Sequence, residues 1–258
     1  MAAVTARLRA AGSVFAEEEA AVLAGAADSP EALRTMVGQR VAGLPLEHIV
    51  GWAEFCGIRI ALEPGVFVPR RRSELLVRLA SARVAPGSVV VDLACGSGAI
   101  GAAIAARATS AAVPVELHAC DIDPAAVRCA RRNLGATGGH VYAGDLYDHL
   151  PVALRGQVSV IAANVPYVPT EAVALMPAEA RMHEPRIALD GGSDGLDILR
   201  RAAAEADAWL APGGHLLIET SRGQAQAAAD VFTADGLAAD IAIDDDLGAT
   251  VIMGRLPA

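Results

Sequence analysis

An asparagine and a tyrosine flank a rigid turn at a point where a buried strand should end. The run "SVIAA" predicts such a strand, and Asn164, Val165, Pro166 and Tyr167 follow it directly. Pro166 has a fixed φ and favours an extended Val165, which aims the Val165 carbonyl oxygen in one direction. With the side-chain oxygen of Asn164 pointing the same way, two acceptors can bind a planar NH₂ group and orient its lone pair, while Tyr167 stacks on it.

The alternative is an ordinary asparagine-led turn that leaves a strand. Two prolines and one aromatic side chain lie within residues 164–170, and this density favours a binding site. The carboxyl ends of parallel strands are also where open α/β sheets bind their ligands. We therefore expect these residues to hold a nitrogen nucleophile.

A glycine-rich turn lies earlier in the chain. In "VVVDLACGSGAIG" an apolar strand runs into Gly96, Gly98 and Gly101, which spell G-x-G-x-x-G. Glycines let the main chain approach a ligand, and the helix that follows offers unpaired N–H groups at its start. Asp121 ends the next strand, 20 residues after Gly101, where a carboxylate can accept both hydroxyls of a ribose. This spacing predicts a ligand of the adenosine type; a tight turn without a ligand is the alternative.

Two features favour S-adenosylmethionine over a nicotinamide dinucleotide. Asp92 precedes Gly96 by four residues, in the D-x-x-x-G-x-G arrangement typical of methyltransferases. We expect its carboxylate to suit a ligand with an amino-acid end and a sulfonium, and to repel a pyrophosphate. A dehydrogenase also has no obvious use for the stretch from Asn164 to Tyr167.

Asp145 ends a third apolar run, in "YAGDLYDHL". It can face the edge of an adenine ring, with Leu146 against the ring face. Equally, Asp145 can cap a helix that follows it. The residues leave both interpretations open.

The elements that must position these residues follow from the apolar pattern after Pro86. Apolar runs alternate with helical segments, which is typical of a parallel sheet covered on both faces. The runs are "SVVVDLACG", "VELHACD", "GHVYAGD", "VSVIAAN" and "GGHLLIET". The tail, "AADIAIDDDLGATVIMGRL", predicts two strands that close the sheet as an antiparallel pair. The expected fold class is therefore α/β.

The front of the chain has a different pattern. "DSPEALRTMVGQRVAG" has helix signals: Asp28 or Ser29 as the cap, Pro30 in the first turn and Gly43 beyond the end. A short hairpin is expected around Cys56-Gly57, followed by a connector into a helix. We therefore predict a helical N-terminal domain over residues 1–50, a hairpin and connector over 51–84, and a catalytic domain over 85–258.

Composition excludes several classes of function. The 258 residues are 53% hydrophobic, and all 21 basic residues are arginine, so lysine chemistry is absent. The net charge of −9 argues against a protein that holds nucleic acid with its whole surface. The four cysteines form no CxxC pair and the six histidines have no metal-ligand spacing, so no metal is expected. No apolar run is long enough to span a membrane, and we expect a cytoplasmic protein.

Together these landmarks resemble those of the HemK/PrmC-like protein-(glutamine-N5) methyltransferases. The likeness covers nearly the whole chain, and Asp121 is one of the matching residues. The matching stretches are "GLPLEHIVGWAEFCG", "PGVFVPRRRSELLV", "DLACGSGAIG", "NVPY", "HEPRIALDGGSDGLDILRR" and "LLIETSRGQ". So many landmarks in order make the resemblance specific.

The resemblance implies a class I S-adenosylmethionine-dependent methyltransferase: a Rossmann-like, mostly parallel sheet with an antiparallel C-terminal strand, plus a small helical N-terminal domain that helps to recognise a protein. For the best-known members that protein is a class I peptide chain release factor, methylated at the glutamine of its Gly-Gly-Gln motif. The residues implied to contact the cofactor are Ala94, Cys95, Gly96, Ser97, Gly98, Asp121, Leu146 and Asn164, to which the residue patterns add Asp92 and Asp145. Those expected to hold the glutamine and take part in catalysis are Asn164, Val165, Pro166 and Tyr167, with Glu184 and Pro185 at the mouth of the substrate site.

The chain departs from the family pattern at two places. Val165 stands where the family has the first proline of Asn-Pro-Pro-Tyr, and a carbonyl oxygen remains available there. The connector usually reads Arg-Pro-Glu/Asp-Thr-Glu, whereas here it is Arg70-Arg71-Arg72-Ser73-Glu74. The added positive charge near the substrate groove indicates a different protein partner; alternatively, Arg71 and Arg72 are solvated surface residues.

Three other functions remain open from the sequence. Such a motif also serves enzymes that methylate the exocyclic amino groups of DNA or RNA bases, because a base, like a glutamine, presents a planar NH₂ group; the acidic charge and the front domain favour a protein substrate without direct nucleic-acid binding. A nicotinamide-dependent oxidoreductase can share the glycine turn. An inactive protein that binds S-adenosylmethionine is the third possibility, because of Val165.

Overall fold

A seven-stranded sheet forms the centre of the computed structural model, which describes residues 1–258. The strand order is β5-β4-β3-β6-β7-β9-β8. The strands are β3 (Ser88–Leu93), β4 (Val115–Asp121), β5 (His140–Ala143), β6 (Val158–Ala163), β7 (Leu210–Thr220), β8 (Ala238–Asp244) and β9 (Ala249–Arg255). Pairing is parallel from β5 to β7, whereas β9 runs antiparallel to both β7 and β8. The predicted α/β sheet with an antiparallel C-terminal pair is confirmed.

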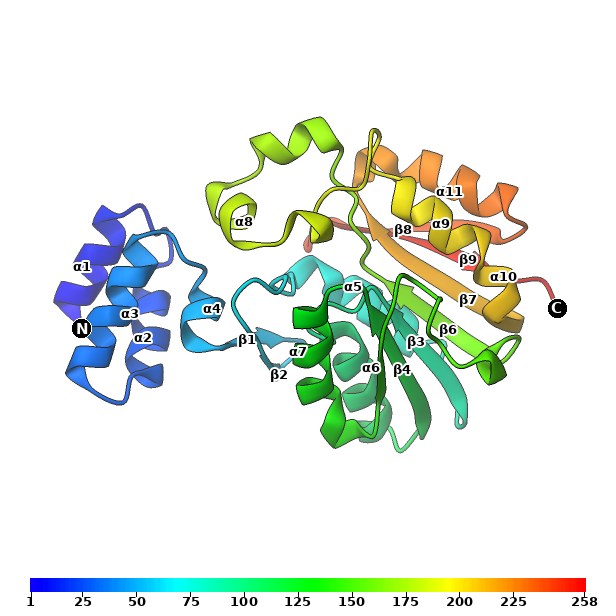
Figure 1. Ribbon diagram of the computed structural model, residues 1–258, viewed down its shortest axis with the longest axis horizontal. Coiled ribbons are helices and arrows are strands. Elements are labelled where there is room, and N and C mark those ends of the chain that lie inside the picture. Colours follow the sequence, from blue (N-terminus) through cyan, green and yellow to red (C-terminus); the bar gives the residue numbers. More distant parts are fainter.

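Helices cover both faces of the sheet, so the molecule has three layers (Figure 1). One face packs against α5 (Glu74–Ser81), α6 (Ala99–Ser110) and α7 (Pro124–Leu134). The other packs against α9 (Asp197–Ala204), α10 (Ala206–Trp209) and α11 (Ala225–Ala234). Because both faces are covered, β3 and β6 are apolar at nearly every position, as the uninterrupted runs of the sequence predicted.

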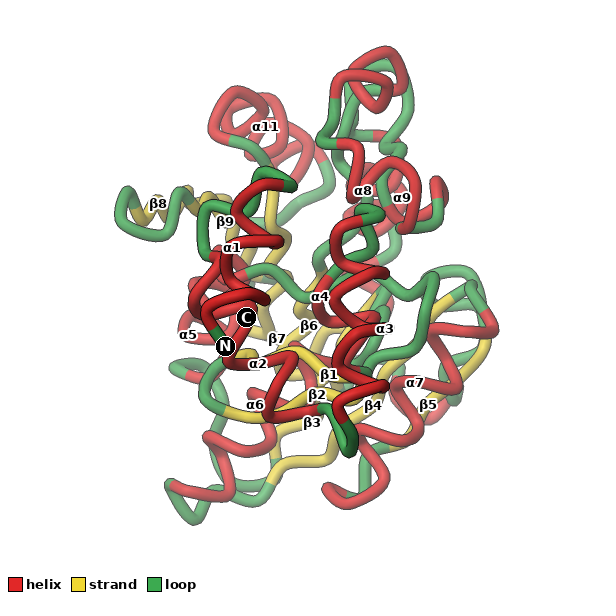
Figure 2. The backbone as a smooth tube through the Cα atoms, turned by 90° about the vertical axis from the view of Figure 1, so that its left-hand side faces the viewer, coloured by secondary structure: helices red, strands yellow, loops and turns green.

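The first four helices form a unit of their own beside the sheet (Figure 1). They are α1 (Ala2–Ala10), α2 (Ala16–Ala26), α3 (Pro30–Val41) and α4 (Leu46–Val50). A small core of five buried side chains, centred on Leu8 and Leu23, holds them together. Figure 2 looks along this unit toward the sheet behind it. The predicted boundary after residue 50 coincides with the end of α4, and that after residue 84 lies between α5 and β3; the domain boundaries stay a prediction.

A hairpin and a connector lead from the helical unit to the sheet. Strands β1 (Trp52–Phe55) and β2 (Ile58–Ala61) pair across Cys56 and Gly57, both of which have positive φ, as a two-residue hairpin turn requires. The predicted hairpin is confirmed. The connector ends in the 3₁₀ turn η1 (Arg71–Ser73), which runs directly into α5.

A long segment between β6 and α9 was assigned no element from the sequence. It contains η4 (Thr170–Leu175), α8 (Ala178–His183) and η5 (Arg186–Ala188). Arg40 of α3 contacts this segment, because its guanidinium donates a hydrogen bond to Glu179 of α8 at 2.7 Å. The same guanidinium also pairs with Glu19 of α2. The helical unit is therefore joined to the segment that follows the Asn164–Tyr167 stretch. The remaining 3₁₀ turns are η2 (Gly135–Thr137), η3 (Val152–Leu154) and η6 (Arg222–Gln224).

None of the helices combines the length and the apolar character that crossing a membrane would demand.

The cap of α3 gives a test of local stability. Ser29, and not Asp28, is the N-cap residue, because its hydroxyl accepts the Ala32 N–H at 3.1 Å. We expect Ser29→Ala to lower the free energy of unfolding of the helical unit by about 1 kcal/mol, the usual value of such a cap. Chemical denaturation followed by circular dichroism measures it. Asp28→Ala is the matched control and should have a smaller effect; an equal effect would contradict the assignment.

Candidate active site

A cavity of about 550 Å³ opens where the parallel strands end. Residues that follow β3, β4, β5 and β6 all line it, and so do parts of the connector and of the segment around α8. Such a volume is ordinary for a site that encloses a small molecule. Most of the residues that the sequence assigned to the cofactor and to the glutamine lie here. They are Ala94, Cys95, Gly96, Ser97, Asp121, Asp145, Leu146, Asn164, Val165, Pro166, Tyr167, Glu184 and Pro185.

The three glycines of the glycine turn lie in different places: one lines the cavity and two pack in the core. Gly96, with φ of +55°, lines the cavity, and a Cβ there would meet open space. Gly98 does not line the cavity: it begins α6 with φ of +76°, and a Cβ would lie 3.2 Å from the Ala130 Cα of α7. Gly101 is likewise packed against Asp92. Of the three, only Gly96 lies where the main chain could approach a ligand, and its predicted role stays a prediction; the other two allow close packing of helices and strand.

Asp121 joins the glycine turn to the end of β4. Its Oδ2 accepts the Gly96 N–H at 2.7 Å, and its Oδ1 accepts the Asp123 N–H at 2.8 Å. Burial raises the pKa of Asp121, and these two hydrogen bonds oppose that rise. Each carboxylate oxygen can accept a second hydrogen bond, so two acceptor positions remain. That is the number needed for the two hydroxyls of a ribose.

Asp92 does not reach the cavity. Its side chain is fully buried under the glycine turn, where Oδ2 accepts the Gly101 N–H at 2.8 Å and Oδ1 has no partner. Burial, with a contribution from the nearby charge of Asp121, raises the pKa of Asp92 to about 8. Because the Asp92 side chain lies behind the turn and outside the cavity lining, the electrostatic argument made for it from the sequence does not apply. Asp92 supports the turn from behind.

Asp145 and Leu146 line the cavity beyond β5. No helix starts at Asp145, so the helix-capping interpretation is wrong; its carboxylate pairs instead with Arg201 of α9 at 2.8 Å. Leu146 has a φ of +50°, an uncommon conformation for this residue type. Ala94, after β3, shares this feature with a φ of +53°. The two residues follow the strands on either side of β4. Residues in such uncommon conformations cluster at binding sites, and no sequence pattern predicts them.

The stretch from Asn164 to Tyr167 leaves β6 at the same edge. Val165 is buried, and the side chain of Asn164 is held by Ser73, whose Oγ accepts a hydrogen bond from Asn164 Nδ2 at 3.2 Å. With Nδ2 engaged, Oδ1 is the Asn164 atom left to accept a hydrogen bond. Ser73 is buried and lines the cavity, and it is a site residue that the sequence patterns did not predict. The signal was present, because the family pattern also places a hydroxyl, that of threonine, at this position.

The three arginines of the connector lie in different surroundings. Arg71 is exposed and lies outside the cavity lining, as a solvated residue should. Arg70 and Arg72 line the cavity, and each pairs with a buried carboxylate: Arg70 with Glu184, and Arg72 with Glu219 at 2.9 Å. Arg72 is therefore only partly a solvated surface residue: its side chain is 42% exposed, yet its guanidinium pairs with a buried carboxylate. The expected excess of positive charge is largely balanced by these two partners.

Glu184 and Pro185 directly follow α8 and line the cavity. The Glu184 side chain accepts the Val68 N–H at 3.2 Å in addition to its pair with Arg70. Burial raises the pKa of Glu184, and the charge of Arg70 opposes this rise. The Glu184 side chain is 1% exposed and ties the connector to the segment around α8, while the predicted role of Pro185 in shaping the opening stays a prediction.

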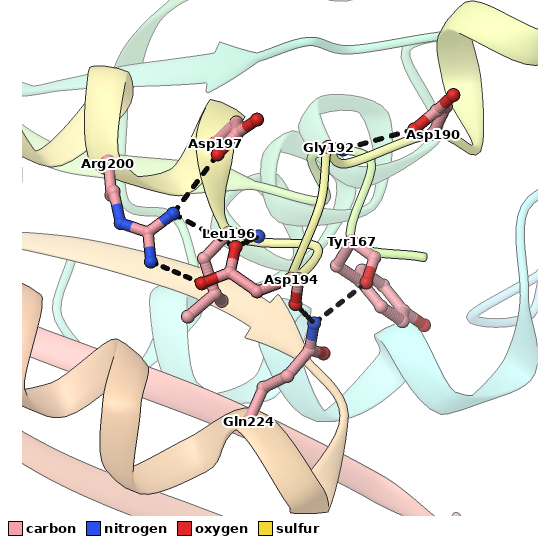
Figure 3. Close-up of polar contacts among 8 residues, drawn as sticks. All are labelled: Tyr167, Asp190, Gly192, Asp194, Leu196, Asp197, Arg200 and Gln224. Carbon is pink, nitrogen blue, oxygen red and sulfur yellow. Dashed lines mark hydrogen bonds and ion pairs between the residues drawn. The ribbon is translucent and has the colours of Figure 1, made fainter. Parts of the chain in front are cut away.

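A glycine-rich loop, residues 190–197, supports Tyr167 from behind (Figure 3). Gly191 donates its N–H to Val168 O at 2.8 Å, and a Cβ on Gly191 would lie 2.6 Å from Pro166 O. The Gln224 amide donates to Tyr167 O and to Asp194 O, both at 2.9 Å (Figure 3). The later landmarks "DGGSDG" and "SRGQ" therefore converge on one turn, a role that the sequence analysis did not assign to them.

Comparisons with known proteins agree with this geometry. The Methyltransferase small domain family matches residues 57–193. The "Release factor glutamine methyltransferase" of Geobacter sulfurreducens is 34% identical over 225 residues, which are 86% of this chain and 77% of that protein. The protein of the same name from Mycolicibacterium smegmatis is 37% identical over 224 residues, 84% of this chain and 77% of that one.

Solved structures show the same fold. The crystal structure of a methyltransferase from Pyrococcus furiosus has a TM-score of 0.57 at 16% identity, and the match covers 78% of this chain and 90% of that one. The predicted class I methyltransferase fold and the predicted family resemblance are both confirmed. This chain belongs to the release factor glutamine methyltransferase family, whose members are methyltransferases that use S-adenosylmethionine.

Proposed function

We propose that this protein transfers a methyl group from S-adenosylmethionine to the side-chain amide nitrogen of a glutamine in a class I peptide chain release factor, within the Gly-Gly-Gln motif. The observation that carries the proposal is the shared cavity. It brings Asn164, oriented by Ser73, to the same strand edge as the glycine turn and Asp121. Membership of the family supplies the kind of substrate.

The residues along the ends of β3, β4 and β5 fit the cofactor. Main-chain groups around Gly96 and Ser97 face the cavity without a side-chain obstacle, and Asp121 keeps two free acceptor positions for a ribose. Leu146 and Ile122 provide apolar surface for an adenine ring. The bound cofactor supplies an electrophilic methyl group on a sulfonium.

The residues from Asn164 to Tyr167 orient the glutamine amide and stabilise the charge that develops on its nitrogen. An amide nitrogen is a weak nucleophile because its lone pair is delocalised, so orientation and charge stabilisation have to assist it. Asn164 Oδ1 and the Val165 carbonyl would accept the two hydrogens of the NH₂ group, which directs the lone pair and stabilises the positive charge that develops on nitrogen. Tyr167 would cover the flat face of the amide.

Val165 is compatible with activity. The reaction needs a carbonyl oxygen at this position, and valine supplies one. The Val165 side chain is buried among the core residues of the α9–α11 face, and this packing fixes the residue in place of the missing proline ring. An inactive protein would have no need of an Asn164 side chain held by a buried hydroxyl.

The direct test is methylation of a release factor. After incubation of a cognate class I release factor with this protein and S-adenosylmethionine, peptide mass spectrometry should show one added methyl group on the Gly-Gly-Gln glutamine. A release factor with this glutamine replaced by asparagine is the control and should stay unmodified. If the cofactor binds but no methyl group appears on the glutamine, the proposed substrate is wrong.

Asp121 and Asp92 should behave differently toward the cofactor. We expect Asp121→Ala to weaken S-adenosylmethionine binding roughly 10- to 100-fold, because hydrogen bonds to a charged group contribute about 1.5–3 kcal/mol. Asp92→Asn keeps an acceptor for the Gly101 N–H and should change the affinity little. Isothermal titration calorimetry measures both dissociation constants. Equal losses would show that Asp92 acts at the ligand after all.

Ser73 should matter for turnover and not for cofactor affinity. Ser73→Ala removes the partner of Asn164 Nδ2 and should lower kcat roughly five- to tenfold, the value of one hydrogen bond of about 1 kcal/mol. Ser73→Thr keeps the hydroxyl and should restore most of the activity. Steady-state kinetics with the release factor give kcat, and calorimetry should show an unchanged dissociation constant for S-adenosylmethionine. A normal kcat for Ser73→Ala would refute this role.

A further inference from the structure

Glu219 is a fully buried carboxylate that has no part in the reaction as proposed. It stands next to the end of β7, and its side chain is 0% exposed. Oε1 accepts hydrogen bonds from Arg72 Nε at 2.9 Å and from the Tyr167 hydroxyl at 3.3 Å, while Oε2 has no partner. Glu219 itself does not line the cavity, but both residues that it contacts do. It therefore reaches the site only through Arg72 and Tyr167.

Tyr167 is held from three directions. Its hydroxyl donates to Glu219, and the guanidinium carbon of Arg72 lies 5.6 Å from the centre of its ring, within the range of a cation–π contact. Its main-chain oxygen accepts the Gln224 amide, as Figure 3 shows. These contacts hold the phenol at its hydroxyl and on one ring face, and they hold the residue at its main chain. The other face is the one that remains for a ligand.

A contribution to the stability of the fold does not by itself explain why Glu219 is buried with Oε2 lacking a hydrogen-bond partner. Glu219 is fully buried, whereas the Arg72 side chain is 42% exposed, so the cost of removing a charge from water falls mainly on the carboxylate, and a partly solvated ion pair offsets little of it. Positioning a neighbouring group is a use that justifies such a cost. In this chain the need is evident, because Val165 replaces a residue whose ring would have made the turn before Tyr167 more rigid.

We propose that Arg72 and Glu219 are positioning residues that hold the Tyr167 ring parallel to the glutamine amide. The inference rests on the proposed function for the identity of the amide. Arg72 fixes Glu219 and covers one ring face, and Glu219 anchors the hydroxyl. Together they keep the opposite face of the ring flat against the substrate, so they favour a planar primary amide over a bulkier or non-planar amine.

Arg71 provides a matched control. It is adjacent to Arg72, has the same charge and is exposed outside the cavity. We expect Arg72→Met to lower kcat/KM for the release factor on the order of tenfold to 10²-fold, as misplacement of a positioning group does. The dissociation constant of S-adenosylmethionine should change less than about twofold, since Arg72 is placed at the substrate. Arg71→Met should leave both quantities unchanged.

Arg72→Met leaves Glu219 buried without its cation, and this variant can fail to fold. The double variant Arg72→Met with Glu219→Gln removes both charges and avoids that problem. It should fold with normal cofactor affinity and still lose kcat/KM. Arg72→Lys keeps the charge without the planar group and should restore activity only in part. Normal kcat/KM in the folded double variant would overturn the proposal.

A double-mutant cycle shows whether Arg72 acts through Tyr167. In the Tyr167→Leu background no ring is left to position, so Arg72→Met should cause little further loss of kcat/KM. A merely structural role predicts the same loss in both backgrounds. Additive effects would therefore overturn the proposal.

Nuclear magnetic resonance gives a readout that does not depend on turnover. The chain has three tyrosines, so ring-labelled tyrosine yields a spectrum simple enough to assign by substitution. Ring flips of Tyr167 should be faster in the Arg72→Met protein than in the wild type or in Arg71→Met. Equal flip rates in all three would overturn the proposal. If the wild type shows a restrained ring but does not methylate the release factor, the proposed substrate fails and the positioning role stands.

Discussion

Parallel pairing of β3, β4, β5 and β6 is the constraint on which the rest of the structure depends. Because these strands pair in parallel, their carboxyl ends all lie at the same edge of the sheet. Residues that are far apart in the sequence therefore meet at this edge. Leu93 pairs with both Cys120 and Ala163, so the glycine turn, Asp121 and Asn164 each begin one step beyond the same row of residues. The cavity is a direct consequence of this register, and the surrounding helices and the connector only close it.

Sequence patterns predicted the parts of this arrangement that are local. Apolar runs identified the central strands β3 and β6 because both of their faces are buried, and Ser29, Pro30 and Gly43 marked the ends of α3. The spacing from Gly101 to Asp121 located a carboxylate at the end of the next strand, because a helix of standard length must return the chain to the sheet. These signals depend on neighbouring residues and on chain length, so one sequence suffices to detect them.

The contacts that sequence patterns missed join distant segments. Ser73 meets Asn164 across 91 positions, and Arg72 meets Glu219 across 147, and no periodicity reports on such pairs. Asp92 was placed in the correct strand but on the wrong side of the glycine turn, because the motif does not say which way its carboxyl group points. The segment around α8 lacks the long apolar pattern of a core helix, since one short turn packed against the helical unit does not need it.

The exclusive use of arginine has a consequence for the response of the molecule to pH. The cation is an arginine in every ion pair except that of His118, and a guanidinium stays protonated throughout the range in which proteins are folded. A change of pH can therefore break the arginine pairs only by protonating their carboxylates, which happens at low pH. Arg200 holds the pKa of Asp194 at about 2, below its ordinary 3.8; such a lowered carboxyl stabilises the fold above the ordinary pKa and loses this contribution as the pH falls through the lowered one. Alkali, which in other proteins neutralises lysine partners, leaves this network of charges intact.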